Sequence, residues 1–304
     1  MRALVIGLGS IGRRHARILA RIGCDVAAVS RSQAGTPGVY GNIGAAMRYW
    51  APAYAVVATP TSAHGSALRE LREAGYDGPV LVEKPLFAQP GELPPEQLEG
   101  VHVGYNLRFH PLLRQLRWRL RHQRVLTATL YVGQHLPHWR ERDYRTCYSA
   151  SRAQGGGVLR DLSHELDYAC WLFGPWRALT ARGGHYSGLE IDSDDVYGLM
   201  AETARCPLLQ LHLNYLDRRA RRFLLVHTEA HTYALDLIRG ELQIDRDATI
   251  NCGGTGTMEG TYAAQHRAML RGGRGVCTAA QAAETVHMIE AAERAAAERR
   301  WVKR

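Results

Sequence analysis

The sequence predicts an α/β protein, with a doubly wound parallel sheet in its N-terminal part and then an α+β domain with an open antiparallel sheet. In residues 1–104, short apolar runs alternate with helical patterns, an order typical of parallel sheets covered by helices. From 176 to 250, apolar runs follow one another without helices, which indicates antiparallel pairing. At roughly 150 residues per domain, 304 residues fit two domains. We place these at 1–122 and 123–304.

Each strand of the first domain is a short apolar run, and each helix has apolar residues at helical spacing. The expected strands cover 3–6, 26–30, 53–58, 80–83 and 101–104, and the expected helices cover 11–22 and 62–74. This alternation predicts a Rossmann-type domain.

The second half begins with a long strand at 125–132, a polar loop, and one helix from about 158 to 172. Further strands follow at 178–183, 196–202, 208–216, 223–228, 232–238 and 242–244. Ala-rich helices at 262–270 and 279–299 are expected to pack back on the first domain. Because an open sheet leaves a face to be covered, we expect a homodimer or homotetramer formed through it.

The composition, with 46% hydrophobic and 22% charged residues, is that of a soluble globular protein. No apolar run approaches the ~20 residues of a membrane span. The apolar stretch at 3–6 is too short for a signal-peptide core. We therefore expect no membrane association and a cytoplasmic location.

The formal net charge is +9, but the arginines are spread along the chain without an aromatic-interleaved basic stretch. We therefore expect no nucleic-acid partner, and a surface that favours anionic small molecules. The cysteines fall at no metal or redox spacing, so we expect buried thiols in a reducing compartment and no metal site. They are Cys24, Cys147, Cys170, Cys206, Cys252 and Cys277.

Lysine is scarce: only Lys84 and Lys303 are lysine among 38 basic residues. A buried lysine can take part in proton chemistry that arginine cannot. Lys84 is therefore a candidate functional residue, although Lys303 shows that scarcity alone is not proof.

A G-x-G-x-x-G sequence lies between the first expected strand and helix, at Gly7, Gly9 and Gly12, with Ser10 and Ile11 inside it. The first glycine permits a tight turn, the second a close approach of pyrophosphate, and the third close helix–strand packing. The alternative is a glycine-rich turn of another α/β fold.

The residues after the second strand indicate the cofactor. NAD-binding domains place an acidic residue there to bind the ribose. This sequence has Ser30 and Arg31 instead, which suit a ribose 2′-phosphate and predict NADP(H) over NAD(H). The alternative is that Arg31 is one more solvated arginine.

Two further motifs follow strands whose carboxyl ends share one sheet edge. Thr59-Pro60-Thr61 precedes His64, which either reaches a cofactor ribose or packs in the first helical turn. Glu83-Lys84-Pro85 would direct an ammonium group at the same crevice, where it could stabilise an alkoxide or polarise a carbonyl.

A glycine run at 155–157 leads into the expected helix with Asp161, His164 and Asp167. Asp161 and His164 would share one helical face, as expected of a general base and its orienting carboxylate. The alternative is a capping aspartate and a core histidine.

Together these motifs resemble the Gfo/Idh/MocA family of NAD(P)-dependent oxidoreductases over essentially the whole chain. The segment 104–109 is also similar to the family's segment after the last Rossmann strand. The resemblance implies that Lys84 and His164 are catalytic and that Asp161 assists. The family's commoner spacing is four residues from Asp to His; here it is three.

The resemblance also implies a sugar-type substrate, nucleotide sugars and acidic sugars included. The loop 139–149, with Arg140, Arg142, Arg145 and Tyr148, would lie near the mouth of the site, and its passage into 161–167 is similar to members found with surface-polysaccharide biosynthesis. Expected substrate contacts are Lys84, Asn106, Arg145, Tyr148, Asp161 and His164. Expected cofactor contacts are Gly7, Gly9, Ser10, Ile11, Gly12, Ser30, Arg31, Thr59, Pro60, Thr61, His64, Glu83 and Lys84.

The sequence thus predicts an NADP(H)-preferring oxidoreductase that moves hydride between nicotinamide and a sugar-type alcohol or ketone. The alternative is a non-catalytic dinucleotide-binding regulatory protein on the same fold, because fold does not fix function.

Overall fold

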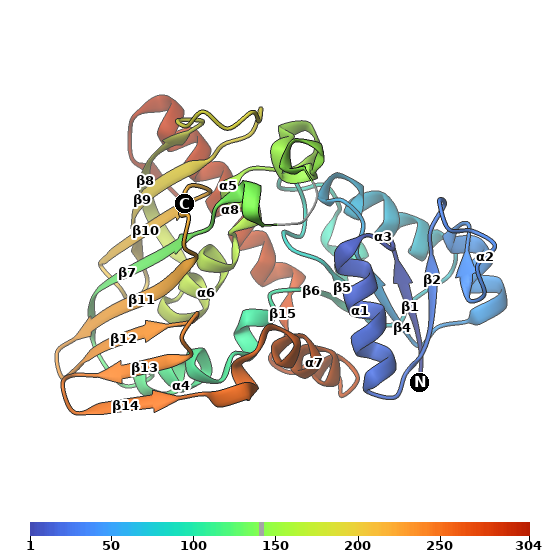
Figure 1. Ribbon diagram of the computed structural model, residues 1–304, viewed down its shortest axis with the longest axis horizontal. Coiled ribbons are helices and arrows are strands. Elements are labelled where there is room, and N and C mark those ends of the chain that lie inside the picture. Colours follow the sequence, from blue (N-terminus) through green and yellow to red (C-terminus); the bar gives the residue numbers. More distant parts are fainter. Residues whose placement is uncertain (140–142) are drawn as a thin grey trace. The chain divides into compact units, whose positions relative to one another are not determined.

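The computed structural model describes residues 1–139 and 143–304, and the chain forms two compact units (Figure 1). Unit 1 consists of Met1–Phe109 and Thr257–Ala283, and unit 2 of His110–Gly256 and Glu284–Arg304. The domain boundary at residue 122 rests on the change in sequence pattern near that position and stays a prediction.

Unit 1 contains a seven-stranded sheet in the order β15-β6-β5-β4-β1-β2-β3. Its strands pair in parallel except β15, which is antiparallel to β6. This confirms the predicted doubly wound parallel sheet. The strands are β1 (Arg2–Ile6), β2 (Asp25–Val29), β3 (Val39–Tyr40), β4 (Tyr54–Val57), β5 (Val80–Val82), β6 (Val101–Val103) and β15 (Cys277–Thr278).

The helices of unit 1 are α1 (Ser10–Arg21), α2 (Ile43–Trp50), α3 (His64–Glu73) and α7 (Met258–Met269). The helix α1 buries Leu19 in the core cluster that also contains Val56 of β4 and Leu81 of β5. The helix α2 is absent from the elements that the sequence predicts, although the Asn42 side chain caps it by accepting a hydrogen bond from the backbone N–H of Ala45.

The strand order reverses direction between β1 and β4. In such sheets the crevice outside the carboxyl ends of the strands is where ligands bind. Gly7 follows β1, Thr59 follows β4 and Glu83 follows β5. Three of the predicted motifs therefore share one edge of the sheet.

Unit 2 contains a nine-stranded sheet in the order β14-β13-β12-β11-β7-β10-β9-β8-β16. It is antiparallel except for one parallel pair, β7 with β10, which the sequence did not predict. Its strands are β7 (Val125–Gly133), β8 (Trp176–Gly184), β9 (Val196–Thr203), β10 (Leu208–Asn214), β11 (Arg221–Thr228), β12 (Thr232–Asp236), β13 (Glu241–Ile244), β14 (Ala248–Asn251) and β16 (Val302–Lys303).

The helices α4 (Pro111–Leu120), α5 (Val158–Asp161) and α6 (His164–Phe173) belong to unit 2, as does α8 (Ala279–Glu298) from Glu284 onward. Alternate residues of β7 such as Ala128, Leu130 and Val132 are buried and form one side of the core. No described helix is both long and apolar enough to cross a bilayer.

The prediction of one helix over 158–172 is wrong. The helix ends at Asp161, and a new one begins at His164. At the break, the backbone N–H groups of Ser163 and Glu165 donate to carbonyls only three residues back, those of Arg160 and Leu162. These tighter bonds turn the chain, so Asp161 and His164 do not share the face of one helix.

Candidate active site

The glycine turn after β1 leaves the N-terminus of α1 open. Gly7 has φ +95°, and a Cβ on Gly12 would stand 1.8 Å from the carbonyl oxygen of Gly7, so both positions require glycine. At Gly9, by contrast, no atom of the described residues lies within 4 Å of where a Cβ would be.

The first turn of α1 suits an anion. Among the described residues no side chain caps this helix, and no acidic residue lies in its first turn. Its backbone N–H groups therefore face open space beside Gly9, at the positive end of the helix dipole. A dinucleotide pyrophosphate fits this turn.

The end of β2 presents hydroxyl groups beside an arginine. The Oγ atoms of Ser30 and Ser32 are 3.3 Å apart, and Arg31 between them is exposed. This is the neighbourhood in which the ribose of a bound dinucleotide would lie.

Thr59 and His64 follow β4. The Thr59 hydroxyl is buried and has no hydrogen-bond partner among the described residues, so it is available to a ligand. His64 is buried, with Nδ1 3.0 Å from the carbonyl of Leu86 and Nε2 3.1 Å from that of Thr59. Burial lowers the pKa of His64, while its backbone hydrogen bonds oppose that shift. His64 thus ties the Thr59 turn to the chain after Lys84, and its contact with cofactor stays a prediction.

Glu83 and Lys84 follow β5, and the Lys84–Pro85 peptide is cis. One carboxylate oxygen of Glu83 accepts a hydrogen bond from the backbone N–H of Lys84 at 3.1 Å. The other lies 2.8 Å from Nε2 of His15. Burial alone would raise the pKa of Glu83, but the hydrogen bond from His15 and the positive charge of Lys84 lower it below its usual value.

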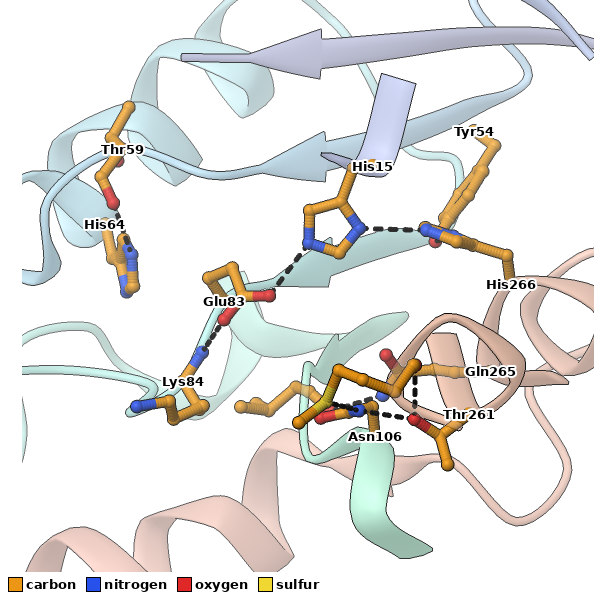
Figure 2. A network of polar contacts seen from close by, with 12 residues as sticks. His15, Tyr54, Thr59, His64, Glu83, Lys84, Asn106, Thr261, Gln265 and His266 are labelled. Carbon is orange, nitrogen blue, oxygen red and sulfur yellow. Dashed lines mark hydrogen bonds and ion pairs between the residues drawn. The ribbon is translucent and has the colours of Figure 1, made fainter. Parts of the chain in front are cut away.

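His15 continues into a chain of buried polar groups that the sequence did not indicate. Its Nδ1 lies 2.9 Å from Nε2 of His266, whose Nδ1 lies 3.0 Å from the hydroxyl of Tyr54. Figure 2 shows the two imidazoles between Glu83 and Tyr54, supplied by α1 and α7.

Asn106 lies in unit 1 after β6 and is fully buried. Its amide donates to the hydroxyl of Thr261 on α7 at 2.7 Å (Figure 2). Its carbonyl oxygen has no hydrogen-bond partner among the described residues. That oxygen is the part of Asn106 left to bind a ligand.

In unit 2, Asp161 and His164 are buried with exposed fractions of 5% and 8%. The hydroxyl of Tyr215 donates to Oδ2 of Asp161 at 2.6 Å. Burial, and then the Asp161 carboxylate, raises the pKa of Tyr215 well above its usual value, with a further contribution from nearby Tyr148. Tyr215 stays protonated and holds Asp161 in place.

Behind His164, the carboxylate of Glu165 pairs with the Arg222 guanidinium at 2.8 Å and accepts from the Tyr168 hydroxyl at 2.9 Å. All three are buried. This pair fixes the first turn of α6, because a buried charge is tolerated only when it is paired.

The predicted substrate arginine, Arg145, is already paired. It binds Asp143 through its side chain and Glu190 at 2.8 Å, and it is exposed. Two carboxylates offset its charge, which weakens its suitability for an anionic sugar. Arg140 and Arg142 lie outside the described residues.

The structure therefore groups the predicted residues in two sets. Unit 1 brings the glycine turn, Thr59 and Lys84 to one sheet edge, with Asn106 after β6. Unit 2 holds Asp161, His164, Tyr148 and Arg145. The sequence missed His15, Tyr54, His266 and Tyr215. Only His15, three residues after Gly12 on a strongly amphipathic helix, had a local signal, that of a buried polar residue.

Comparison with solved structures supports the fold. GenD2 from gentamicin A biosynthesis, solved with NAD, is 22% identical with a TM-score of 0.83, covering 100% of this chain and 96% of its own. Levoglucosan dehydrogenase, in complex with NADH, is 18% identical with a TM-score of 0.83, covering 100% and 98%. A myo-inositol dehydrogenase from Corynebacterium glutamicum is 18% identical with a TM-score of 0.79, also covering 100% and 98%. No curated protein sequence matches the chain.

Two family models match the chain itself. An oxidoreductase family model with an NAD-binding Rossmann fold matches residues 1–95. A model of the GFO/IDH/MocA C-terminal domain matches residues 114–233. Together the two matches span more than half of the chain, which therefore belongs to the Gfo/Idh/MocA family of oxidoreductases.

Proposed function

We propose that the chain is an NADP(H)-preferring oxidoreductase acting on a hydroxyl-bearing carbon of a sugar-type substrate. The observation that supports this best is in unit 1. There an open glycine turn and a lysine backed by a buried carboxylate share the carboxyl edge of one parallel sheet.

The residues of unit 1 fit a dinucleotide. Gly7, Gly9 and the N-terminus of α1 would hold the pyrophosphate, and the unpartnered hydroxyl of Thr59 would accept or donate a hydrogen bond nearby. A bound nicotinamide supplies the hydride acceptor or donor. The chain's own residues supply orientation and proton handling.

Proton transfer is assigned to His164 by resemblance to the family. In the oxidation direction, neutral His164 takes the proton of the substrate hydroxyl. The Lys84 ammonium stabilises the oxygen as its negative charge develops. Asp161 orients the substrate or His164, and Tyr215 holds that carboxylate by its 2.6 Å hydrogen bond.

The preference for NADP(H) depends on Ser30 and Arg31. Two hydroxyls and an exposed guanidinium stand where an acidic residue would select NAD(H). Fluorescence titration should give tighter NADPH than NADH binding. Arg31→Ala should weaken NADPH selectively, by roughly 1.5–3 kcal/mol if a charged hydrogen bond is lost. Equal affinities for both cofactors in the unaltered chain would contradict the proposed preference for NADP(H).

The substrate class is proposed from the neighbouring structures, which include levoglucosan and myo-inositol dehydrogenases. Because Arg145 is already paired, we favour neutral sugars and cyclitols as the first part of a panel, followed by acidic and nucleotide sugars.

The deciding experiment is turnover across that panel with both cofactors, for the unaltered chain and Lys84→Arg. The arginine keeps the charge, but its larger planar guanidinium cannot place a compact ammonium at the substrate oxygen, so we expect a loss of at least ~100-fold in kcat, with little change in cofactor affinity. Stoichiometric cofactor binding with no turnover on any sugar would favour the regulatory alternative. Near-normal turnover of Lys84→Arg would make Lys84 a structural cation.

A homodimer or homotetramer through the sheet of unit 2 is part of this proposal. Met200 of β9 and Leu208 of β10 are exposed by 42% and 37%, and such a contact would cover these apolar side chains. Light scattering tests this, since a monomer at micromolar concentration contradicts it. The cytoplasmic location stays a prediction.

A further inference from the structure

Four buried polar side chains of unit 1 form a continuous hydrogen-bonded chain that ends at Lys84. Tyr54, His266, His15 and Glu83 are exposed by 1%, 0%, 0% and 6%. Their successive donor–acceptor distances are 3.0, 2.9 and 2.8 Å. In Figure 2 the chain runs from Tyr54 of β4 through the two imidazoles to Glu83, whose second oxygen faces the Lys84 backbone.

With Glu83 ionised and His15 neutral, the direction of this chain is fixed. An ionised carboxylate only accepts, so Nε2–H of His15 donates to Glu83. A neutral imidazole then has a bare Nδ1, so Nε2–H of His266 donates to His15. By the same argument, the Tyr54 hydroxyl donates to Nδ1 of His266. Every donor points toward Glu83.

We propose that Tyr54, His266 and His15 are positioning residues that hold Glu83 as an anion beneath Lys84, and that this buried anion keeps the Lys84 side chain protonated. The proposal rests on the proposed function, because it explains how the suggested catalytic lysine is held in its charged form.

In the alternative, Glu83 is protonated and its O–H donates to Nε2 of His15, so that every donor of the chain points away from Glu83. Burial, then His15, lowers the pKa of His266 well below its usual value, and burial raises the pKa of Tyr54 well above its own. Both therefore stay neutral, and the charge that the chain presents toward Lys84 is that of the Glu83 carboxylate.

The charged and titratable groups around the chain are few. Lys84 and His64 interact electrostatically with Glu83, and Tyr76 and Cys24 with Tyr54. His15 also packs edge-on against the Tyr262 ring. The guanidinium carbon of Arg14 lies over the same ring, 5.7 Å from its centroid. Of these groups, the Lys84 ammonium is the cation that the Glu83 carboxylate can stabilise directly.

The scarcity of lysine allows a direct test without substrate or cofactor. Competitive acetylation with trace acetic anhydride from pH 6 to 11, followed by peptide mass spectrometry, reports the fraction of neutral amine at Lys84, with Lys303 as internal reference. Glu83→Gln should raise the Lys84/Lys303 labelling ratio at pH 8 by roughly threefold to tenfold, since the amine loses its counter-ion. His15→Phe should raise it less, and Tyr54→Phe least.

The matched control is Tyr76→Phe, which removes another buried tyrosine hydroxyl of unit 1, one that donates to the Pro79 carbonyl instead. Its ratio should equal that of the unaltered chain. If Glu83→Gln or His15→Phe fails to fold, Tyr54→Phe decides, because it removes a single oxygen. Variants that lose thermal stability while the ratio stays unchanged would show a purely structural chain and overturn the proposal.

The tautomers of the two imidazoles provide an independent test of the donor direction. Long-range ¹H–¹⁵N correlation spectra should show His15 and His266 both protonated at Nε2 and bare at Nδ1. The opposite tautomer at either ring overturns the direction. Failure of the proposed function is distinguishable: it would appear as normal turnover of Lys84→Arg, whereas the labelling ratio tests the Glu83 chain alone.

Discussion

Two glycine-rich turns of this chain, at 7–12 and 155–157, look alike in sequence and have opposite roles in the structure. After β1, the space beside Gly9 is empty of described atoms, and the helix that follows is uncapped. Before α5, a Cβ on Gly157 would stand 2.3 Å from Oδ1 of Asp194, and one on Gly156 would stand 2.2 Å from the carbonyl of Tyr148. The first turn leaves room for a ligand, whereas the second is filled by the protein itself.

The difference lies in which group satisfies the helix N-terminus. At α5, Asp194 accepts the backbone N–H of Leu159, and its own carbonyl accepts that of Val158. Burial raises the pKa of Asp194, partly offset by the Leu159 N–H and the charge of Arg160. At α1 a ligand must supply the acceptor. The second turn instead fixes the segment that presents Asp161 and His164.

The largest expected effect tests whether the second turn presents a working base. His164→Ala should lower kcat by roughly 10²–10⁴-fold, the range for a lost general base. In the oxidation direction, kcat of the unaltered chain should rise with pH through one ionisation, because the imidazole must be neutral to accept a proton, and the variant should lack that limb. Steady-state rates against pH are the measurement.

A double variant checks the assignment. If Asp161 and His164 act as a unit, Asp161→Asn combined with His164→Ala should be scarcely worse than His164→Ala alone. Full activity of His164→Ala with its pH limb intact would mean that the proton goes elsewhere, with Tyr148 or Lys84 next to test.

The sequence predicted local features well and distant partners poorly. The roles of Gly7 and Gly12 follow from a motif of six residues, and Lys84 from its place after a strand. The helix α4 was missed although Leu112, Leu113, Leu116 and Leu120 are buried at helical spacing, a signal present in the sequence.

The remaining errors arise from contacts that no local pattern encodes. His15 and His266 are 251 residues apart, and Tyr215 is 54 residues from Asp161. The break between α5 and α6 depends on three-residue hydrogen bonds, whereas the apolar pattern runs through it unchanged. The parallel pairing of β7 with β10 also depends on topology rather than on alternation.

The second largest effect tests the packing role of the second turn. Gly157 has φ +115°, which a residue with a Cβ rarely adopts. Gly157→Ala adds that strain to the contact with Asp194, so the free energy of unfolding should fall by about 2–4 kcal/mol. Chemical denaturation followed by circular dichroism measures it. Cofactor affinity of the folded protein should be unchanged, and a stable variant would show that Asp194 gives way.

Gly9→Ala is the matched change in the first turn. Gly9 has an extended backbone at φ −66° and ψ −171°, so alanine is tolerated and stability should not change. The added Cβ would occupy the space left for pyrophosphate, and overpacking of about 1–3 kcal/mol corresponds to a roughly 5- to 150-fold loss of cofactor affinity. Fluorescence titration measures this loss. Unchanged affinity would mean that the dinucleotide does not approach Gly9.

The smallest expected effect concerns Tyr215, which tests whether Asp161 must be held by a hydrogen bond to support the reaction. Tyr215→Phe removes one hydroxyl that donates to Asp161 in a fully buried position. A net hydrogen-bond contribution of about 0.5–1.5 kcal/mol predicts a roughly twofold to tenfold loss of kcat if Asp161 must be held in one orientation. The control is Tyr233→Phe, which changes another buried tyrosine of unit 2. The hydroxyl of Tyr233 accepts from Gln123, so this variant should leave kcat unchanged.

If kcat of Tyr215→Phe instead fell as far as that of His164→Ala, the tyrosine itself would take part in proton transfer. An unaltered rate would show that Asp161 needs no such support, and that the three-residue spacing to His164 already fixes it.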